Sequence, residues 1–345
     1  MKNYAKALLG VALTIAIQPV ATLAQEGEVN IYSYREPGLI QPLLDQFTAE
    51  TGIKTNVLSA ENGLIERIEA EGELSPADVL LTVDIGNLVS AKKAGITQAI
   101  SDETLDRLPP AFRDEDGMWA ALSLRARIFY ASKDRVSETE IDYEDIAGPE
   151  WKGRLCTRAG DHPYNIGLIA NRIAAWGEEK TADWLEKVRD NLVSAPSGND
   201  RAQVKSIFSG ECDLAIGNTY YMGLMLNNDS EPEQKDWAAS VNTIYPDTSG
   251  SGTQVNGAGV VLAKYAPNLE NANLLIEFLL SDEAQQMYAN TNYEYPAVSG
   301  VAPSELVQSW GTLNASDVPL GEMAELSGAA ATLVEQTRFN EGPQN

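Results

Sequence analysis

Short apolar runs alternate with segments of helical periodicity along most of the chain. Residues 29–34 have the composition of a buried strand, and Leu39, Leu43, Leu44 and Phe47 then recur with the spacing of one helix face. This alternation predicts an α/β protein. The further predicted strands are residues 55–58, 77–82, 213–216 and 257–262, and the further predicted helices are residues 63–70, 271–280 and a segment that starts at residue 281.

The amino-terminal segment has the pattern of an export signal. Lys2 and Lys6 precede an apolar run over residues 7–17, and small side chains at Thr22 and Ala24 favour cleavage before Gln25. The alternative is a membrane anchor, but the apolar run is well short of the roughly 20 residues that span a bilayer. We therefore expect residues 1–24 to be a cleaved signal peptide and the mature chain to be exported.

The length of the mature chain favours two lobes. Roughly 320 residues exceed what one hydrophobic core usually serves. The sequence shows neither an internal repeat nor a low-complexity linker. We therefore expect the chain to cross between the two lobes more than once.

The chain is strongly acidic. Loss of Lys2 and Lys6 from the 25 basic residues leaves 23, against 50 acidic side chains. Nucleic acids and anionic membrane surfaces are bound through clustered Lys and Arg, so this balance argues against both as partners. Solubility accounts for most of the acidity.

Cys156 and Cys212 are the two cysteines of the sequence. An even pair in an exported chain predicts a disulfide, with two buried thiols as the alternative. The bridge would enclose 55 residues and stabilise the fold by a few kcal/mol.

The common enzyme signatures are absent from the sequence. There is no Walker-type phosphate loop, no Gly-x-Ser-x-Gly elbow and no His-Glu-x-x-His. His162 is the one histidine, so an ordinary zinc site cannot be assembled and a Ser-His-Asp triad would depend on that imidazole. A pair of carboxylates acting as acid and base remains open, because Asp and Glu are abundant.

Tyrosines stand where strands end or helices begin. Tyr220 and Tyr221 follow the predicted strand 213–216, Tyr164 precedes an apolar helical run, and Tyr34 leaves the first strand. Open α/β sheets bind ligands at these places. Adjacent tyrosines on an extended or turning backbone point apart, which suits two ligands of one ion only if the chain bends there. Residue chemistry alone favours one buried and one exposed ring at 220 and 221. Brought together, such phenolates would suit a hard trivalent cation, which prefers anionic oxygen and displaces the phenol proton.

Eight segments of the chain resemble one known family. They are Tyr-Ser-Tyr-Arg at 32–35, Ser-Pro-Ala-Asp-Val-Leu-Leu-Thr-Val-Asp at 75–84, Asp-Gly-Met-Trp at 116–119, Arg-Ala-Arg at 125–127, Trp-Lys-Gly-Arg at 151–154, Asn-Thr-Tyr-Tyr-Met-Gly at 218–223, Gly-Ala-Gly at 257–259 and Asn-Tyr-Glu-Tyr-Pro at 292–296. Over nearly its whole mature length the chain is similar to the periplasmic ferric-iron-binding proteins of ABC importers, a transferrin-like family, and within it to the tyrosine-rich branch.

The resemblance implies a set of iron ligands. Tyr220 and Tyr221 match the paired tyrosine ligands after Asn-Thr, and Tyr164 matches a third ligand at a helix start. For the amino-terminal ligand some relatives carry His-Tyr after the arginine, where this chain has Glu36 and Pro37. Tyr34, Glu36, or a water or anion could fill that position, and Tyr34 is included in the predicted set.

The resemblance also implies a synergistic anion, carbonate or a small carboxylate. Arg125 is the first choice to hold it and Arg35 the second, with an ion pair as the alternative role for each. His162 is expected not to bind iron. Tyr143, Tyr293 and Tyr295 are expected to be structural.

The implied fold is the type II periplasmic-binding-protein fold, two α/β lobes with a hinge and an interlobe cleft. The predicted amino-terminal lobe is residues 25–122 plus 250–300, and the carboxyl-terminal lobe is residues 123–249 plus 301–345. The implied function is capture of Fe(III) by a monomer and its delivery to an ABC permease, without catalysis. The rival hypotheses are the same fold binding an organic cation or an oxyanion, and a secreted hydrolase.

Overall fold

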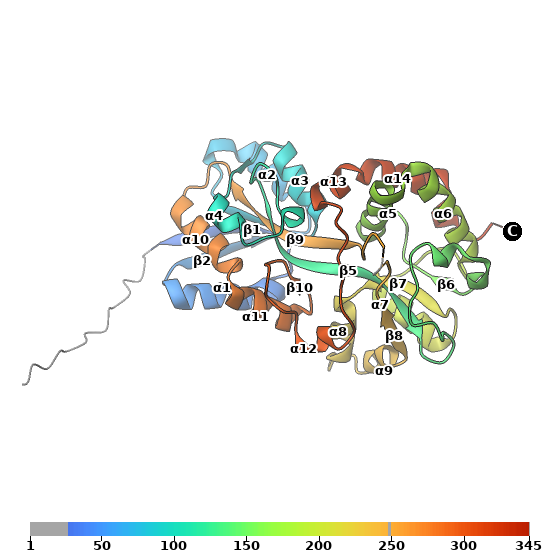
Figure 1. Cartoon of the computed structure of the whole chain (residues 1–345). Helices are drawn as coiled ribbons and strands as arrows, with labels where there is room; N and C mark the ends of the chain where they lie inside the picture. The colour runs from blue at the N-terminus through green and yellow to red at the C-terminus, as the bar shows by residue number, and fades with distance from the viewer. Residues whose placement is uncertain (1–26, 248–249, 345) are drawn as a thin grey trace, which may run out of the picture.

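The computed structural model of the chain describes residues 27–247 and 250–344. Its elements gather into two α/β lobes, which two long strands join, β5 (Ala120–Ser132) and β9 (Val255–Ala263) (Figure 1). The predicted signal peptide, residues 1–24, lies outside the described residues. In the described part of the chain, no helix is long and apolar enough to cross a membrane.

The first third of the described chain alternates strands with helices, as its apolar pattern predicts. The predicted strands at 29–34, 55–58 and 77–82 are confirmed to within one or two residues at each end. The elements are β1 (Glu28–Ser33), α1 (Pro37–Thr51), β2 (Lys54–Ser59), α2 (Leu64–Glu71), β3 (Val79–Thr82), α3 (Ile85–Lys93), β4 (Thr97–Gln98) and α4 (Asp102–Leu105).

In helix α1 the apolar residues with helical spacing form the buried face. Its buried residues are Ile40, Leu43, Leu44 and Phe47. These lie on one face because side chains three and four positions apart share a side of a helix. Phe47 meets Phe278 with ring centroids 5.6 Å apart, which joins α1 to α10 (Leu269–Leu279) in the core of the amino-terminal lobe.

Strand β5 belongs to both lobes. Its first half pairs antiparallel with β9, and its second half pairs with β7 (Leu214–Asn218) and β8 (Val241–Ile244). The main path of the sheet is β2-β1-β3-β9-β5-β7-β6. Strand β9 pairs in turn with β3, so two strands link the lobes without a flexible linker. The physical consequence is a hinge made of continuous hydrogen-bonded backbone.

The middle of the chain builds the second lobe around β7. Its elements are β6 (Leu155–Cys156), α5 (Pro163–Trp176), α6 (Glu178–Asn191), α7 (Asp200–Ser209), β7, α8 (Tyr220–Leu226), α9 (Glu233–Ala239) and β8. The predicted disulfide between Cys156 and Cys212 is confirmed, with the two Cα atoms 6.0 Å apart. It ties β6 to the turn that precedes β7.

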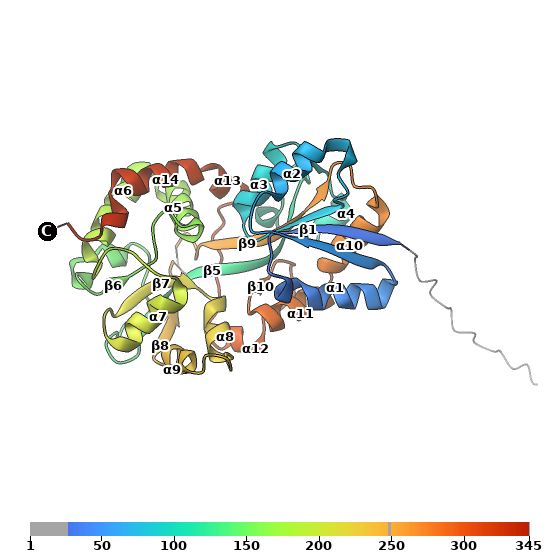
Figure 2. The same ribbon diagram turned by 180° about the vertical axis from the view of Figure 1, so that it is seen from behind.

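The last third of the chain returns to the first lobe and then to the second, as the views from both sides show (Figures 1 and 2). Helices α10 and α11 (Asp282–Asn292) pack on α1, and α14 (Ser327–Gln336) packs on α5 and α6. Helix α13 (Leu320–Glu325) contacts both α3 and α5. The remaining elements are β10 (Tyr295–Pro296) and α12 (Glu305–Gln308). The residue boundaries predicted for the lobes stay a prediction.

Candidate metal and anion site

Tyr220 and Tyr221 begin helix α8, directly after strand β7. Their rings are stacked, with centroids 4.2 Å apart and planes inclined by 29°. The expectation that adjacent tyrosines would point apart is wrong, because the chain turns from strand into helix at Thr219, which has helical dihedral angles. Two phenol groups therefore leave the backbone on the same side.

Tyr164 comes to the same place from helix α5. Its hydroxyl lies 3.2 Å from the hydroxyl of Tyr220, across 56 residues of sequence. His162 caps α5, because its Nδ1 accepts a hydrogen bond from the amide of Tyr164 at 3.1 Å. The imidazole also meets the Tyr164 ring edge to face, with centroids 4.6 Å apart. His162 thus orients Tyr164 at the first turn of the helix.

Three arginines surround the ring of Tyr164. The guanidinium carbons of Arg125, Arg127 and Arg158 lie 5.4, 5.8 and 5.0 Å from its centroid. A cation near the face of an aromatic ring is attracted to it. The arrangement places three positive charges around one tyrosine ring.

Two of these arginines share one buried carboxylate. Asp200 accepts hydrogen bonds from Arg127 Nη1 at 2.8 Å and from Arg158 Nη1 at 3.0 Å. Arg127 Nη2 also donates to Asn165 at 2.7 Å. Asp200 has no exposed surface. This buried network therefore fixes the guanidinium groups of Arg127 and Arg158 next to the ring of Tyr164.

Burial opposes the loss of a proton from Tyr220 and Tyr221. It raises the pKa of Tyr220 well above the ordinary value, and the neighbouring Tyr164 and Tyr221 raise it further, while Arg125 lowers it. The pKa of Tyr221 is raised by burial, Tyr164 and Asp200. At neutral pH these two phenols therefore keep their protons in the metal-free protein.

Arg125 and Arg35 both lie within electrostatic reach of Tyr220 and Glu294. Arg125 is on β5, and its Nη2 donates to the carbonyl oxygen of Val83. Arg35 follows β1 and lies 3.5 Å from the carboxylate of Glu294, with its guanidinium over the ring of Tyr288. The pKa of each arginine is lowered by burial, but Tyr288 and Glu294 for Arg35, and Tyr164 and Glu294 for Arg125, raise it above the ordinary value.

Both arginines keep unused donors. Arg35 Nε and Nη2 and Arg125 Nε are buried and have no hydrogen-bond partner among the described residues. Buried donors normally find an acceptor, so these atoms are chemically suited to an anionic partner.

Tyr34 is engaged elsewhere by its hydroxyl. The oxygen accepts hydrogen bonds from the amides of Leu64 and Ile65 at 2.9 and 3.0 Å, at the start of α2. Its assignment as the amino-terminal iron ligand stays a prediction. Glu36 is exposed at the amino end of α1.

The tyrosines expected to be structural have packing partners. Tyr143 is fully buried, donates to the carbonyl oxygen of Arg127 and meets Phe129 edge to face. The Tyr295 hydroxyl is 2.7 Å from that of Tyr245.

Sequence reasoning missed three charged residues of the site, Arg158, Asp200 and Glu294. Arg158 follows the disulfide cysteine by two positions, and Asp200 is the first residue of α7 after an Asn cap. Neither position carries a local signal of function. Glu294 lies inside one of the segments that carry the resemblance, residues 292–296, but no role was assigned to it from the sequence.

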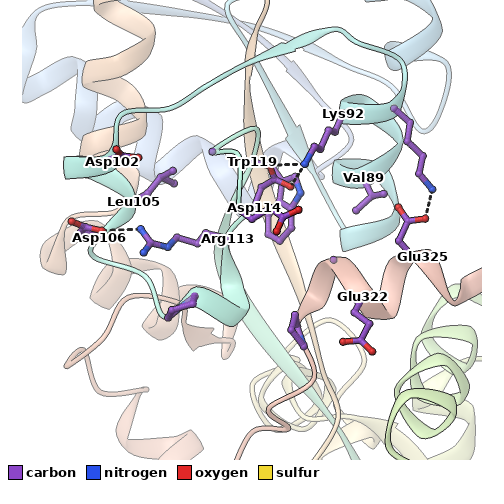
Figure 3. Close-up of a pocket in the computed structure, with 16 residues that line it drawn as sticks. Val89, Lys92, Asp102, Leu105, Asp106, Arg113, Asp114, Trp119, Glu322 and Glu325 are labelled. Carbon is purple, nitrogen blue, oxygen red and sulfur yellow. Dashed lines mark hydrogen bonds and ion pairs between the residues drawn. The ribbon is translucent and has the colours of Figure 1, made fainter. Parts of the chain in front are cut away.

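The cavity in Figure 3 lies at another place, next to α3 and α13. Its volume is about 1000 Å³. The charged residues that line it include Lys92 paired with Asp114, Arg113 paired with Asp106, and Lys93 paired with Glu325. The last pair connects α3 to α13. None of the four predicted iron ligands, Tyr34, Tyr164, Tyr220 and Tyr221, lines this cavity.

Comparison with known proteins decides the family. Residues 75–311 match the model of the bacterial extracellular solute-binding proteins. The chain belongs to this family. Iron uptake protein A1 of Synechocystis sp. is 40% identical to this solute-binding protein over 92% of this chain and 89% of its own length.

Solved structures give the same result for the fold. Ferric iron-binding protein A of Mannheimia haemolytica, in an open conformation, superposes with a TM-score of 0.87 and 45% identity over 91% of this chain and 99% of its own. A Trichodesmium protein in complex with iron and citrate ligands superposes with a TM-score of 0.86 and 36% identity, over 91% and 100%. The predicted type II periplasmic-binding fold and the predicted resemblance are confirmed.

Proposed function

We propose that this solute-binding protein captures Fe(III) between its lobes through the phenolates of Tyr164, Tyr220 and Tyr221 and delivers it to an ABC permease. The observation that carries the proposal is the meeting of these three phenol groups among the guanidinium groups of Arg125, Arg127 and Arg158. Fe(III) is a hard cation that prefers anionic oxygen, and three phenolates would balance its charge. The relatives named for iron uptake and ferric iron binding support this substrate.

Binding would release protons. The raised pKa values of Tyr220 and Tyr221 mean that iron must displace the phenol protons as it binds. A fall in pH would therefore weaken ferric binding. Arg125 offsets part of this penalty, because its positive charge lowers the pKa of Tyr220.

A synergistic anion, carbonate or a small carboxylate, would complete the coordination. Arg125 and Arg35 are the residues to hold it, because the Nε donor of each is buried and has no hydrogen-bond partner among the described residues. The Trichodesmium relative in complex with iron and citrate ligands supports a small carboxylate as one form of this anion. The amino-terminal ligand would be Tyr34 or Glu36, or the position would be left to water or to the anion.

The family supports a proposal for where the protein works and what it docks on. A solute-binding protein with an export signal at residues 1–24 would work in the periplasm as a monomer. Iron would close the lobes by bending at β5 and β9, and the closed form would dock on the permease.

The rival hypothesis, in which the tyrosine rings bind an organic cation, conflicts with the charges of the site. An organic cation would need the open face of a tyrosine ring, but three guanidinium groups already lie within 6 Å of the Tyr164 centroid. Their positive charge would repel a second cation. A bound oxyanion would not meet this obstacle, and a secreted hydrolase would need a substrate that no feature of the site nominates.

The deciding experiment is a titration of the purified protein with ferric citrate, followed by visible absorption. Tyrosinate ligation predicts a phenolate-to-iron charge-transfer band that saturates at one iron per chain. A protein that binds the oxyanion alone would show no such band. Absence of the band with intact folding would overturn the proposed function.

A further inference from the structure

Glu294 is a carboxylate buried among the groups that would hold the anion. It lies between α11 and β10 and is 4% exposed. One of its oxygens accepts a hydrogen bond from the hydroxyl of Ser123 on β5. The same oxygen is 3.5 Å from Arg35 Nη2. Arg125 is two positions after Ser123 on this strand, so both side chains leave the same face of β5.

The carboxylate of Glu294 balances the charge of Arg35 through Nη2 and leaves Nε of the same arginine without a partner among the described residues. The contact at 3.5 Å joins Glu294 to Arg35 Nη2 as an ion pair that is too long for a normal hydrogen bond. Arg35 Nε has no hydrogen-bond partner in the described chain. Arg35 and Arg125 are only 5% and 3% exposed. Two buried cations with no anion nearby would be costly, and one fixed carboxylate reduces that cost. The three groups together carry one net positive charge instead of two.

We propose that Glu294 is an internal counter-charge that weakens the hold of Arg35 and Arg125 on their anion and so keeps the anion exchangeable. This inference rests on the proposed function, because it concerns the anion that accompanies iron. An incoming carbonate or small carboxylate must share Arg35 with Glu294 and is repelled by its negative charge. Glu294 thereby lets the anion leave, and loss of the anion would open a coordination position on the iron.

The test compares anion binding by wild type and Glu294→Gln in the iron-free protein. The probes are citrate and bicarbonate, each titrated separately by calorimetry. Removal of one negative charge a few ångströms from the anion should lower the dissociation constant by about tenfold or more. Glu325→Gln is the matched control, because it removes the same charge beside the separate cavity next to α13 and should leave both constants unchanged.

Two further arms keep the result decisive. Glu294→Asp draws the carboxylate back by one methylene and should also lower the dissociation constant of the anion, but by less than Glu294→Gln. This variant provides the test if Glu294→Gln does not fold. In the iron-loaded protein, Glu294→Gln should slow the loss of the visible band when bicarbonate is withdrawn. Unchanged or weaker anion binding by both variants would overturn the inference, and weaker binding would show that Glu294 positions Arg35. A wild type that binds the anion but shows no ferric band would instead overturn the proposed function.

Discussion

A phenol becomes an iron ligand only after it has lost its proton, so the immediate surroundings of each hydroxyl decide its use. At Tyr220 burial opposes deprotonation, and Arg125 favours it. At Tyr143 burial also raises the pKa, but the hydroxyl is taken up by backbone groups of Arg127 and Gln254. The two hydroxyls differ in their partners, because that of Tyr220 lies beside the hydroxyl of Tyr164, whereas that of Tyr143 is hydrogen-bonded to the backbone.

The tyrosine prediction separates the phenolate from the ring. Tyr164→Phe, Tyr220→Phe and Tyr221→Phe each keep the ring and delete the ligand oxygen, so each should weaken ferric binding by at least about tenfold and shift or bleach the visible band. Tyr265→Phe, at an exposed tyrosine, is the control. Unchanged affinity and spectrum in all three variants would show that the tyrosines are not ligands.

The arginine prediction separates anion binding from folding. Arg125→Ala should weaken iron retention, because it removes the first candidate to hold the anion. Arg127→Ala should instead lower the free energy of unfolding by about 3–5 kcal/mol, because it breaks a buried pair with Asp200. Iron retention is measured by competition with a chelator and stability by urea denaturation. Loss of retention in neither variant would remove Arg125 from the site.

At the scale of elements, the first turn of α5 carries the least ordinary feature. The helix begins with Pro163, whose fixed φ suits a first turn, and is capped by a histidine rather than by Ser, Thr, Asp or Asn. Burial, and then the charges of Arg158 and Arg127, lower the pKa of His162 to about 4, while Asp200 and Asp161 act in the opposite direction. The cap therefore works with a neutral imidazole.

The pH dependence of stability tests this cap. The folded protein keeps His162 neutral down to about pH 4, whereas the unfolded chain protonates it near pH 6.5. As pH falls from about 6.5 to 4, the unfolded state binds up to one more proton, and the stability that His162 contributes is lost. His162→Asn keeps a capping oxygen without a titrating group, so its unfolding free energy should fall less steeply over this window. Identical slopes in urea denaturation series would contradict the assignment.

At the scale of the whole molecule, two strands and one disulfide organise the chain. Strands β5 and β9 join the lobes through continuous backbone pairing, whereas the bridge between Cys156 and Cys212 lies wholly within the second lobe. Bending at the strands can therefore move the lobes without strain on the bridge.

The disulfide prediction concerns stability and not binding. Denatured but unreduced protein should give essentially no reaction with a thiol reagent. The double variant Cys156→Ser/Cys212→Ser should lower the free energy of unfolding by about 4 kcal/mol on the chain-entropy model and keep the ferric band. Two labelled cysteines in the oxidised protein would refute the bridge.

The sequence by itself was enough for the local features of this protein. Periodicity placed strands and helices such as β1 and α1 to within a few residues, because side-chain burial repeats with the geometry of each element. Length predicted two lobes, and the presence of only two cysteines in an exported chain predicted their pairing. The resemblance then selected Tyr164, Tyr220 and Tyr221, whereas composition alone left the pair at 220 and 221 as ordinary aromatic residues.

Only the tertiary structure decided which distant groups meet. The stacking of Tyr220 on Tyr221 depends on the turn at Thr219, and the approach of Tyr164 depends on where α5 docks. The ion pair between Arg35 and Glu294 brings together two segments that are far apart in the sequence, the end of β1 and the start of β10. Such contacts arise from strand register and helix packing over the whole chain, and no local pattern of residues encodes them.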